Sequence, residues 1–231
     1  PIPGARLEFN MGSIWTDTVK LPSFPTLKKD LNTDVLIIGG GMAGVLCAFF
    51  LHQRGVKYTL LEAAQIASGT TGHTTAKITA QHGLIYQKLL AVHGVEKARK
   101  YLDANLKALK IYENLCQKID CDFVTSDSYV YTREHPEKIK KELDALKKLG
   151  YSALFTRKPE LPFDSLGAVG FSNQAQFHPL KFLAGIVPGL NIYEHSKVLG
   201  IDGTNAITES GKITAKKIIV ATHYPFVNRH G

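Results

Sequence analysis

The sequence predicts an α/β fold organised around a parallel sheet. Three observations predict it: a buried strand at 35–38, a glycine pattern directly after it, and an acid that ends a second strand. The glycines are Gly39, Gly41 and Gly44, and the acid is Glu62. The continuous β-branched run before the glycines suits a strand covered on both faces. With an apolar helical stretch between the two strands, this order is that of a Rossmann-like β-α-β unit.

Each residue of this pattern has a physical role in holding a dinucleotide. Gly39 permits a tight turn, Gly41 lets a pyrophosphate approach the backbone, and Gly44 lets the helix pack close to the strand. The helix start offers N–H groups and a positive dipole end to phosphates. Glu62 follows about 20 residues later, where an adenosine ribose expects a carboxylate. Its charge would repel a 2′-phosphate.

Composition limits the class of protein. The 231 residues are 44% hydrophobic and 21% charged, as in a soluble globular protein. No apolar run is long enough to span a membrane, and residues 1–10 lack the pattern of a signal peptide. Three cysteines, Cys47, Cys116 and Cys121, form no CxxC pair. They indicate reduced thiols in a cytoplasmic protein, with no disulfide framework and no metal site.

The net charge of +8 raises the question of a nucleic-acid partner. The lysines are spread along two predicted helices and are interleaved with Glu and Asp, which is typical of solvated helix faces. No aromatic–basic interleaving or recognition-helix pattern is present. We therefore expect no nucleic-acid binding, while an anionic substrate or partner stays open.

The chain divides into five segments. We expect residues 1–10 to be a remnant of an expression vector outside the fold, and 11–32 to be an extended N-terminal arm. Residues 33–84 and 186–231 form the two parts of the nucleotide-binding domain, and 85–185 form part of a second, α+β domain inserted between them.

Patterns along the rest of the chain predict the remaining elements. Residues 63–83 form a loop rich in Gly, Thr and Ser, either a ligand cradle or a flexible linker, and the first is favoured. The inserted domain contains helices at 95–119, 136–149 and 180–187 and strands at 123–132, 151–156 and 167–171. A parallel strand at 191–194 leads into a β-meander of strands at 197–201, 206–209 and 212–215, and a buried strand follows at 217–221. A meander in place of a helical crossover is more typical of FAD-binding than of NAD-binding domains.

Four matches give the chain a family resemblance from about residue 31 onward. They are the glycine–Glu62 pattern, the run from Ser68 to Lys77, the Lys197-Val198 strand, and the sequence 219–222. On these residues the chain resembles FAD-dependent oxidoreductases of the D-amino-acid oxidase and glycine oxidase type. Among them it is most similar to bacterial members whose flavoprotein half precedes a C-terminal Rieske iron–sulfur domain.

The resemblance implies which residues contact FAD. The glycines and Thr71 would face the pyrophosphate, Glu62 the ribose, and the Val198 backbone the adenine. The implied set is Gly39, Gly41, Met42, Ala43, Gly44, Glu62, Ala63, Thr71, His73, Thr74, Thr75, Ala76, Lys77, Val198, Ala221 and Thr222. The chain departs from the family pattern in two places: His223 replaces a common Gly, and His73-Thr74 replaces a common Arg-Asn.

The implied activity is oxidation of an amine or amino-acid-like substrate by hydride transfer to the flavin. No catalytic residue is assigned, although His73, Lys77 and His82 are polar candidates near the flavin. We expect the chain to be a fragment, with any Rieske domain elsewhere in a longer protein, and an exposed sheet edge to permit a homodimer. Two alternatives stay open: an NAD(P)-dependent dehydrogenase, and a non-catalytic binding protein similar to the GDP-dissociation inhibitors.

Overall fold

The computed structural model describes residues 12–159 and 162–224, and these residues form two compact units. The first unit contains the chain up to Thr75 and from Pro179 onward, and the second contains Ala76–His178. The breaks expected from the sequence, after residues 84 and 185, both come later in the chain. The first break lies earlier because residues 77 and 78 pair within the sheet of the second unit. The second lies earlier because residues 179–186 form a helix that packs against the helix at 42–53 of the first unit. The expected vector remnant, 1–10, lies outside the described residues.

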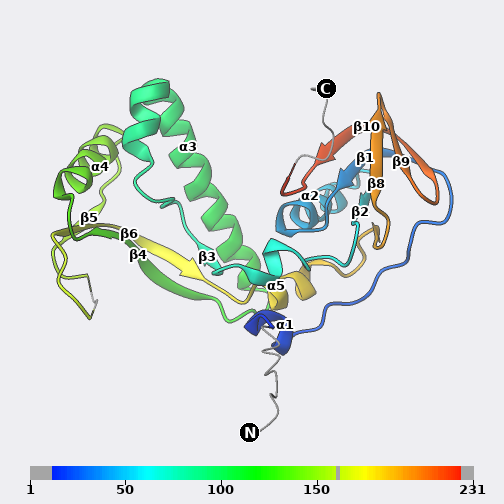
Figure 1. The fold of residues 1–231 in the computed structure, drawn as a ribbon, viewed down its shortest axis with the longest axis horizontal. Helices are drawn as coiled ribbons and strands as arrows, with labels where there is room; N and C mark the ends of the chain where they lie inside the picture. The colour runs from blue at the N-terminus through cyan, green and yellow to red at the C-terminus, as the bar shows by residue number, and fades with distance from the viewer. Residues whose placement is uncertain (1–11, 160–161, 225–231) are drawn as a thin grey trace, which may run out of the picture. The chain divides into compact units, whose positions relative to one another are not determined.

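The first unit is built on a six-stranded sheet in the order β7-β2-β1-β10-β9-β8 (Figure 1). Its strands are β1 (Leu31–Ile38), β2 (Tyr58–Leu61), β7 (Ile192–Tyr193), β8 (Val198–Asp202), β9 (Asn205–Thr208) and β10 (Lys212–Val220). Strands β7, β2, β1 and β10 are parallel, while β8, β9 and β10 form an antiparallel meander. This confirms the predicted α/β fold with a meander in place of a helical crossover.

Strand β1 lies at the centre of this unit. Side chains alternate between the two faces of a strand, and neighbouring Leu36 and Ile37 are both completely buried. Both faces of the sheet are therefore covered, as the unbroken apolar run predicts. One face packs with Leu27 and the meander, and α2 (Met42–Gln53) packs against β1 and β2.

Three shorter helical segments complete the first unit. They are α1 (Ile14–Thr18), the 3₁₀ turn η1 (Thr70–His73) and α5 (Pro179–Ile186). The expected extended arm thus contains a helical turn, which the Ser13 hydroxyl caps by accepting from the Trp15 N–H at 3.3 Å. Strand β1 also begins at Leu31, so the arm ends two residues before its expected boundary at 32/33.

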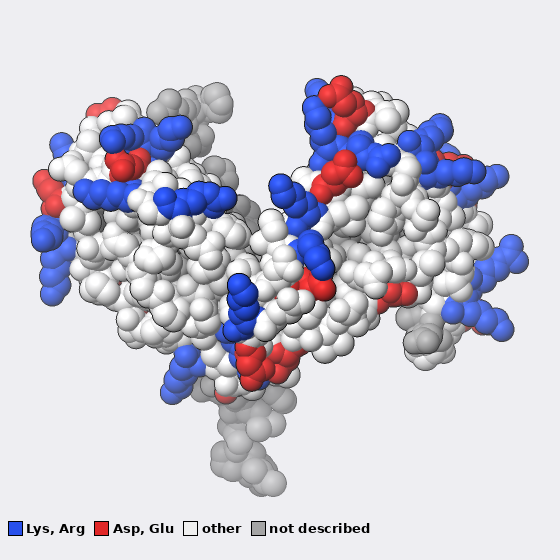
Figure 2. All heavy atoms as spheres, turned by 180° about the vertical axis from the view of Figure 1, so that it is seen from behind, with Lys and Arg blue, Asp and Glu red and all other residues white. Residues whose placement is uncertain are grey.

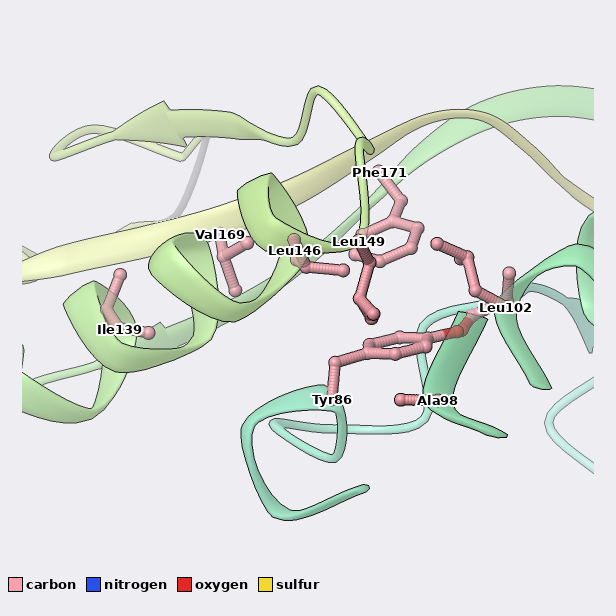
Figure 3. Close-up of a cluster of buried hydrophobic side chains, with 9 residues drawn as sticks. Tyr86, Ala98, Leu102, Ile139, Leu146, Leu149, Val169 and Phe171 are labelled. Atoms are coloured by element: carbon pink, nitrogen blue, oxygen red, sulfur yellow. The ribbon is translucent and has the colours of Figure 1, made fainter. Parts of the chain in front are cut away.

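The second unit is an antiparallel sheet with two helices. Its strands are β3 (Lys77–Ile78), β4 (Val124–Thr132), β5 (Leu154–Thr156) and β6 (Gly167–Gln176), and its helices are α3 (Tyr86–Cys116) and α4 (Pro136–Lys148). In Figure 3, Leu146 of α4 and Leu149, the residue directly after α4, pack with Tyr86, Ala98 and Leu102 of α3 beside Phe171 of β6. These side chains are almost completely buried and form a core of their own.

A buried carboxylate joins the two helices of this unit. Glu142 on α4 accepts hydrogen bonds from the backbone N–H groups of Tyr86 and Gln87 at 2.9 and 2.8 Å. These are first-turn donors of α3 that lack partners within the helix. Burial raises the pKa of the Glu142 carboxyl, while the two N–H donors oppose that shift.

Two predicted elements differ in extent from the observed ones. Helix α3 begins at Tyr86 instead of residue 95, with a kink at Gly94, whose φ is +76°. The strands expected at 212–215 and 217–221 are one continuous strand, β10, because it pairs with β1 from Ile213 to Val220.

The charges are dispersed over the surface. On the face shown in Figure 2, Lys and Arg side chains lie on both units and alternate with acidic residues and uncharged surface. Over the described ranges, no helix has the length and apolar character needed to cross a membrane.

Because β1 is central and buried, truncation of one of its apolar side chains should destabilise the fold. We expect Leu36→Ala to lower the free energy of unfolding by about 2–5 kcal/mol, because a buried cavity forms where the side chain is removed. Leu199→Ala is the matched control, because Leu199 is 52% exposed on β8. It should change stability by less than about 0.5 kcal/mol. Urea denaturation of both variants makes the comparison, and equal losses would contradict the assignment of β1 to the core.

Candidate nucleotide-binding site

A cavity of about 740 Å³ opens in the first unit at the carboxyl ends of β1, β2 and β10. Its size is within the range of small-molecule sites. Ten residues of the implied set line it: Gly39, Gly41, Met42, Ala43, Glu62, Ala63, Thr71, Val198, Ala221 and Thr222. Ligands of open parallel sheets bind in this position, outside the carboxyl ends of the strands.

The turn from β1 to α2 has no space for side chains. Gly39 has a φ of +110°, and a Cβ on it would lie 2.8 Å from the backbone oxygen of Ala221. A Cβ on Gly44 would collide with the backbone oxygen of Gly39. Backbone hydrogen bonds fix the turn on both sides, from Gly39 N–H to Leu61 O and from Ala221 N–H to Ile38 O, both 2.8 Å. The turn between β1 and α2 is therefore in direct backbone contact with the ends of both neighbouring strands, β2 and β10.

The N-terminus of α2 points its first N–H groups into this region. Gly41 is the N-cap, and the first hydrogen bond within the helix runs from Val45 N–H to the Gly41 oxygen, at 3.0 Å. The Met42 N–H is instead donated to the Thr71 hydroxyl oxygen, at 3.0 Å. The loop after β2 is thereby fixed against the helix start, where the helix dipole favours an anion.

Glu62 is held in one orientation by two backbone donors. Its Oε2 accepts from the Gly40 N–H at 2.6 Å, and its Oε1 accepts from the Ala64 N–H at 2.9 Å. Each carboxylate oxygen accepts up to two hydrogen bonds, so both retain capacity for a ligand hydroxyl. Glu62 thus supports the glycine loop and presents a fixed pair of acceptors to the cavity.

Several lining residues lie outside the implied set. Ser68, Gly69 and Thr70 come from the loop whose composition already indicates a ligand cradle. Lys197 adds a cation to the lining, directly before Val198. The remaining ones are Ile38, Leu61, Gln65, Ala67, Ser196 and His223. No spacing pattern in the sequence marks Ser196 or Gln65, because the fold alone brings them here.

The other residues of the implied set do not line the cavity. Gly44 lies beneath the turn, and His73, at the end of η1, contacts the Gly69 oxygen through Nδ1 at 3.0 Å. The Thr74 oxygen accepts from the Trp15 indole, and Thr75 is the last residue of the first unit before the second unit begins. Ala76 and Lys77 belong to the second unit, where Lys77 pairs with Gln176 on β6.

The polar candidate His82 also belongs to the second unit. Its Nδ1 lies 2.8 Å from the hydroxyl of Tyr101 on α3. The structure therefore brings ten of the implied residues together at one cavity, and His73, Lys77 and His82 are not among them.

Comparison with known proteins agrees with this geometry. A family model described as "FAD dependent oxidoreductase" matches residues 34–227. A Bacillus subtilis protein named as a Rieske 2Fe-2S iron–sulfur protein is 37% identical over 230 residues, 94% of this chain and 45% of that protein. Gamma-glutamylputrescine oxidoreductase of Escherichia coli is 26% identical over 87% of this chain and 51% of its own length. The chain spans about half the length of the curated relatives it matches.

Solved structures share the fold. Glycine oxidase from Geobacillus kaustophilus matches with a TM-score of 0.62 at 17% identity, covering 83% of this chain and 55% of that one. L-proline dehydrogenase from P. horikoshii matches with a TM-score of 0.64 at 18% identity, over 84% and 53% of the two chains. At these identities the likeness supports the fold alone.

Because the turn is closely packed, a side chain at Gly44 should destabilise the fold. We expect Gly44→Ala to destabilise the chain by about 1–3 kcal/mol or more, because the added methyl group must displace the Gly39 peptide. Gly200→Ala is the matched control, because a Cβ on Gly200 meets nothing within 4 Å. The control should be neutral or slightly stabilising. Thermal unfolding measures both variants, and a fully stable Gly44→Ala protein would refute the close approach.

Proposed function

Because the chain belongs to the FAD dependent oxidoreductase family, we propose that the cavity of the first unit holds the adenosine and pyrophosphate part of FAD. The observation that carries the proposal is that two features with different chemistry line one cavity. The N-terminus of α2 offers a site for an anion, and Glu62 offers acceptors for hydroxyl groups. A dinucleotide combines both groups in one molecule.

The lining residues fit that group part by part. Gly39 and Gly41 keep the start of α2 free of side chains, so the pyrophosphate would approach the backbone, beside the Thr71 hydroxyl. Glu62 would accept from the ribose hydroxyls. Val198 would lie against the adenine, with Ala221 and Thr222 at the end of β10 closing the remaining side. We propose that His73, Thr74, Thr75, Ala76 and Lys77 continue toward the flavin ring.

Bound FAD would supply the redox chemistry, by accepting a hydride from the substrate. The described residues bind and orient the cofactor, and no side chain among them is assigned a proton-transfer role. We propose an amine or amino-acid-like substrate, because one curated relative is named for such a compound, gamma-glutamylputrescine.

Partners and location follow as further parts of the proposal. A Rieske iron–sulfur domain would accompany this chain in a longer protein, as the name of the Bacillus subtilis relative suggests. A homodimer would form through a sheet edge such as β4, which exposes Tyr129 and Tyr131. A cytoplasmic location fits the three cysteines, which form no disulfide.

Flavin binding by the purified chain tests the central proposal. We expect the chain to carry flavin absorbance or to take up added FAD at one equivalent. Glu62→Gln should weaken FAD binding about tenfold or more, because it removes the charge and one acceptor oxygen. Glu209→Gln, at an exposed acid in the β9–β10 turn, should bind as the wild type does. Failure of the wild-type chain to hold or bind FAD would refute the proposal.

Competition by adenine nucleotides separates FAD from NADP. ADP should displace FAD, whereas adenosine 2′,5′-bisphosphate should compete far less well, because its 2′-phosphate would face the Glu62 carboxylate. In Glu62→Gln the difference between the two competitors should shrink. Preference for the 2′-phosphorylated competitor would instead support an NADP-dependent dehydrogenase.

A further inference from the structure

The N-terminal arm, residues 12–30, contacts the loop that forms one wall of the cavity. Most of it has no regular secondary structure, and α1 is its only helical turn. Only Leu27 is buried, with an exposed fraction of 1%, and it packs in the core with Leu36 and Ile38. An arm with so little buried apolar surface is held mainly by its specific polar contacts.

The first of these contacts is made by the tryptophan. Its Nε1 donates a hydrogen bond of 2.8 Å to the backbone oxygen of Thr74, directly after η1. Helix α1 also packs against η1, and a Cβ on Gly72 would come within 3.5 Å of the Thr16 methyl group. Turn η1 contains Thr71, whose hydroxyl accepts from the Met42 N–H at the start of α2. Trp15 therefore holds the far end of the turn that faces the pyrophosphate position.

The second contact passes through a buried acid. Glu194 is 2% exposed, and its Oε2 accepts from the Phe24 N–H of the arm at 3.0 Å. Its Oε1 accepts from the Ile66 N–H of the cavity loop at 2.8 Å. The Glu194 N–H is donated to the Pro25 oxygen at 3.1 Å. One carboxylate thus binds the arm and the cavity loop at once.

The third contact reaches the lining itself. The Ser196 hydroxyl accepts from the Leu27 N–H at 2.9 Å and donates to the backbone oxygen of Glu194 at 2.8 Å. Ser196 lines the cavity, and its N–H is donated to the backbone oxygen of Glu62 at 2.8 Å. The arm is therefore connected to both sides of the loop between Glu62 and Thr75.

We propose that the arm is a positioning element of the cofactor site. It fixes the loop 62–75 in the conformation that presents Glu62 and Thr71 to the dinucleotide, and FAD binding in turn stabilises the docked arm. Such coupling is reciprocal, since a contact that favours FAD must itself be favoured by FAD. The inference rests on the proposed function, because it takes FAD as the ligand of the cavity.

The test begins with Trp15→Phe, which keeps an aromatic ring and removes the indole N–H. FAD affinity should fall about two- to tenfold, the effect expected for one hydrogen bond, with little change in the unfolding of the FAD-free chain. Glu194→Gln should weaken binding further, because its amide nitrogen replaces one acceptor. Thr214→Val is the matched control. It removes the 2.8 Å hydrogen bond to Asn205 at the opposite end of β10, and should leave FAD affinity unchanged.

A second readout follows the arm itself. Trp15 is the only tryptophan of the chain, so its fluorescence reports on the arm, and FAD should change it. Trypsin cleavage at the exposed Lys20, Lys28 and Lys29 should slow when FAD is bound. In Trp15→Phe this protection should be reduced.

The outcomes separate the two proposals. If the wild-type chain binds FAD while Trp15→Phe and Glu194→Gln bind it equally well, and cleavage of the arm ignores FAD, the positioning role is wrong and the cofactor assignment stands. If the wild-type chain fails to bind FAD, the cofactor assignment is wrong and the positioning role falls with it.

Discussion

The passage from β1 into α2 at Gly39 is the constraint on which the first unit depends. Strand β1 has a parallel partner on each side, so the turn must form in the space between the ends of β2 and β10. Backbone contacts with Leu61 and Ala221 occupy that space, and this excludes side chains from the turn. The same compactness leaves the helix N-terminus open to a ligand. The same glycines therefore serve two purposes. They let the tight turn form between the neighbouring strands, and they leave the helix N-terminus accessible to a ligand.

The sequence predicts those parts of the fold in which the interacting residues lie close together along the chain. The apolar run at 35–38, the glycines and Glu62 lie within one short stretch, and the family resemblance extends this pattern to the ten residues that meet at the cavity. The contacts of Glu194 were not predictable, because Phe24 is 170 residues away and no periodicity links the two. The apolar periodicity predicts a helix from 95 onward, but α3 begins at Tyr86, because the chain is helical on both sides of Gly94 and only kinks there.

The second unit has its own core and a single point of entry and exit. Phe171 stacks with Tyr151 and Tyr86, with ring centroids 4.5 and 5.8 Å apart. The first and last residues of the unit are neighbours, since the Phe177 N–H is donated to the Ala76 oxygen at 3.3 Å and β3 pairs with the end of β6. Because the two ends of the second unit lie together, its insertion does not interrupt the sheet of the first unit. Its helices and loops can therefore vary while the nucleotide-binding unit keeps its geometry.

The position of β10 has a consequence for synthesis of the protein. Leu31 at the start of β1 pairs with Ile213, so the central strand has one open edge until the chain has been made far beyond the second unit. Pairing of strands so far apart in the sequence is slow, and an unpaired apolar strand can associate with strands of other chains. The second unit is one continuous stretch, Ala76–His178, so all of it has been synthesised much earlier. On the ribosome it is therefore expected to fold first, before β10 is available to pair with β1.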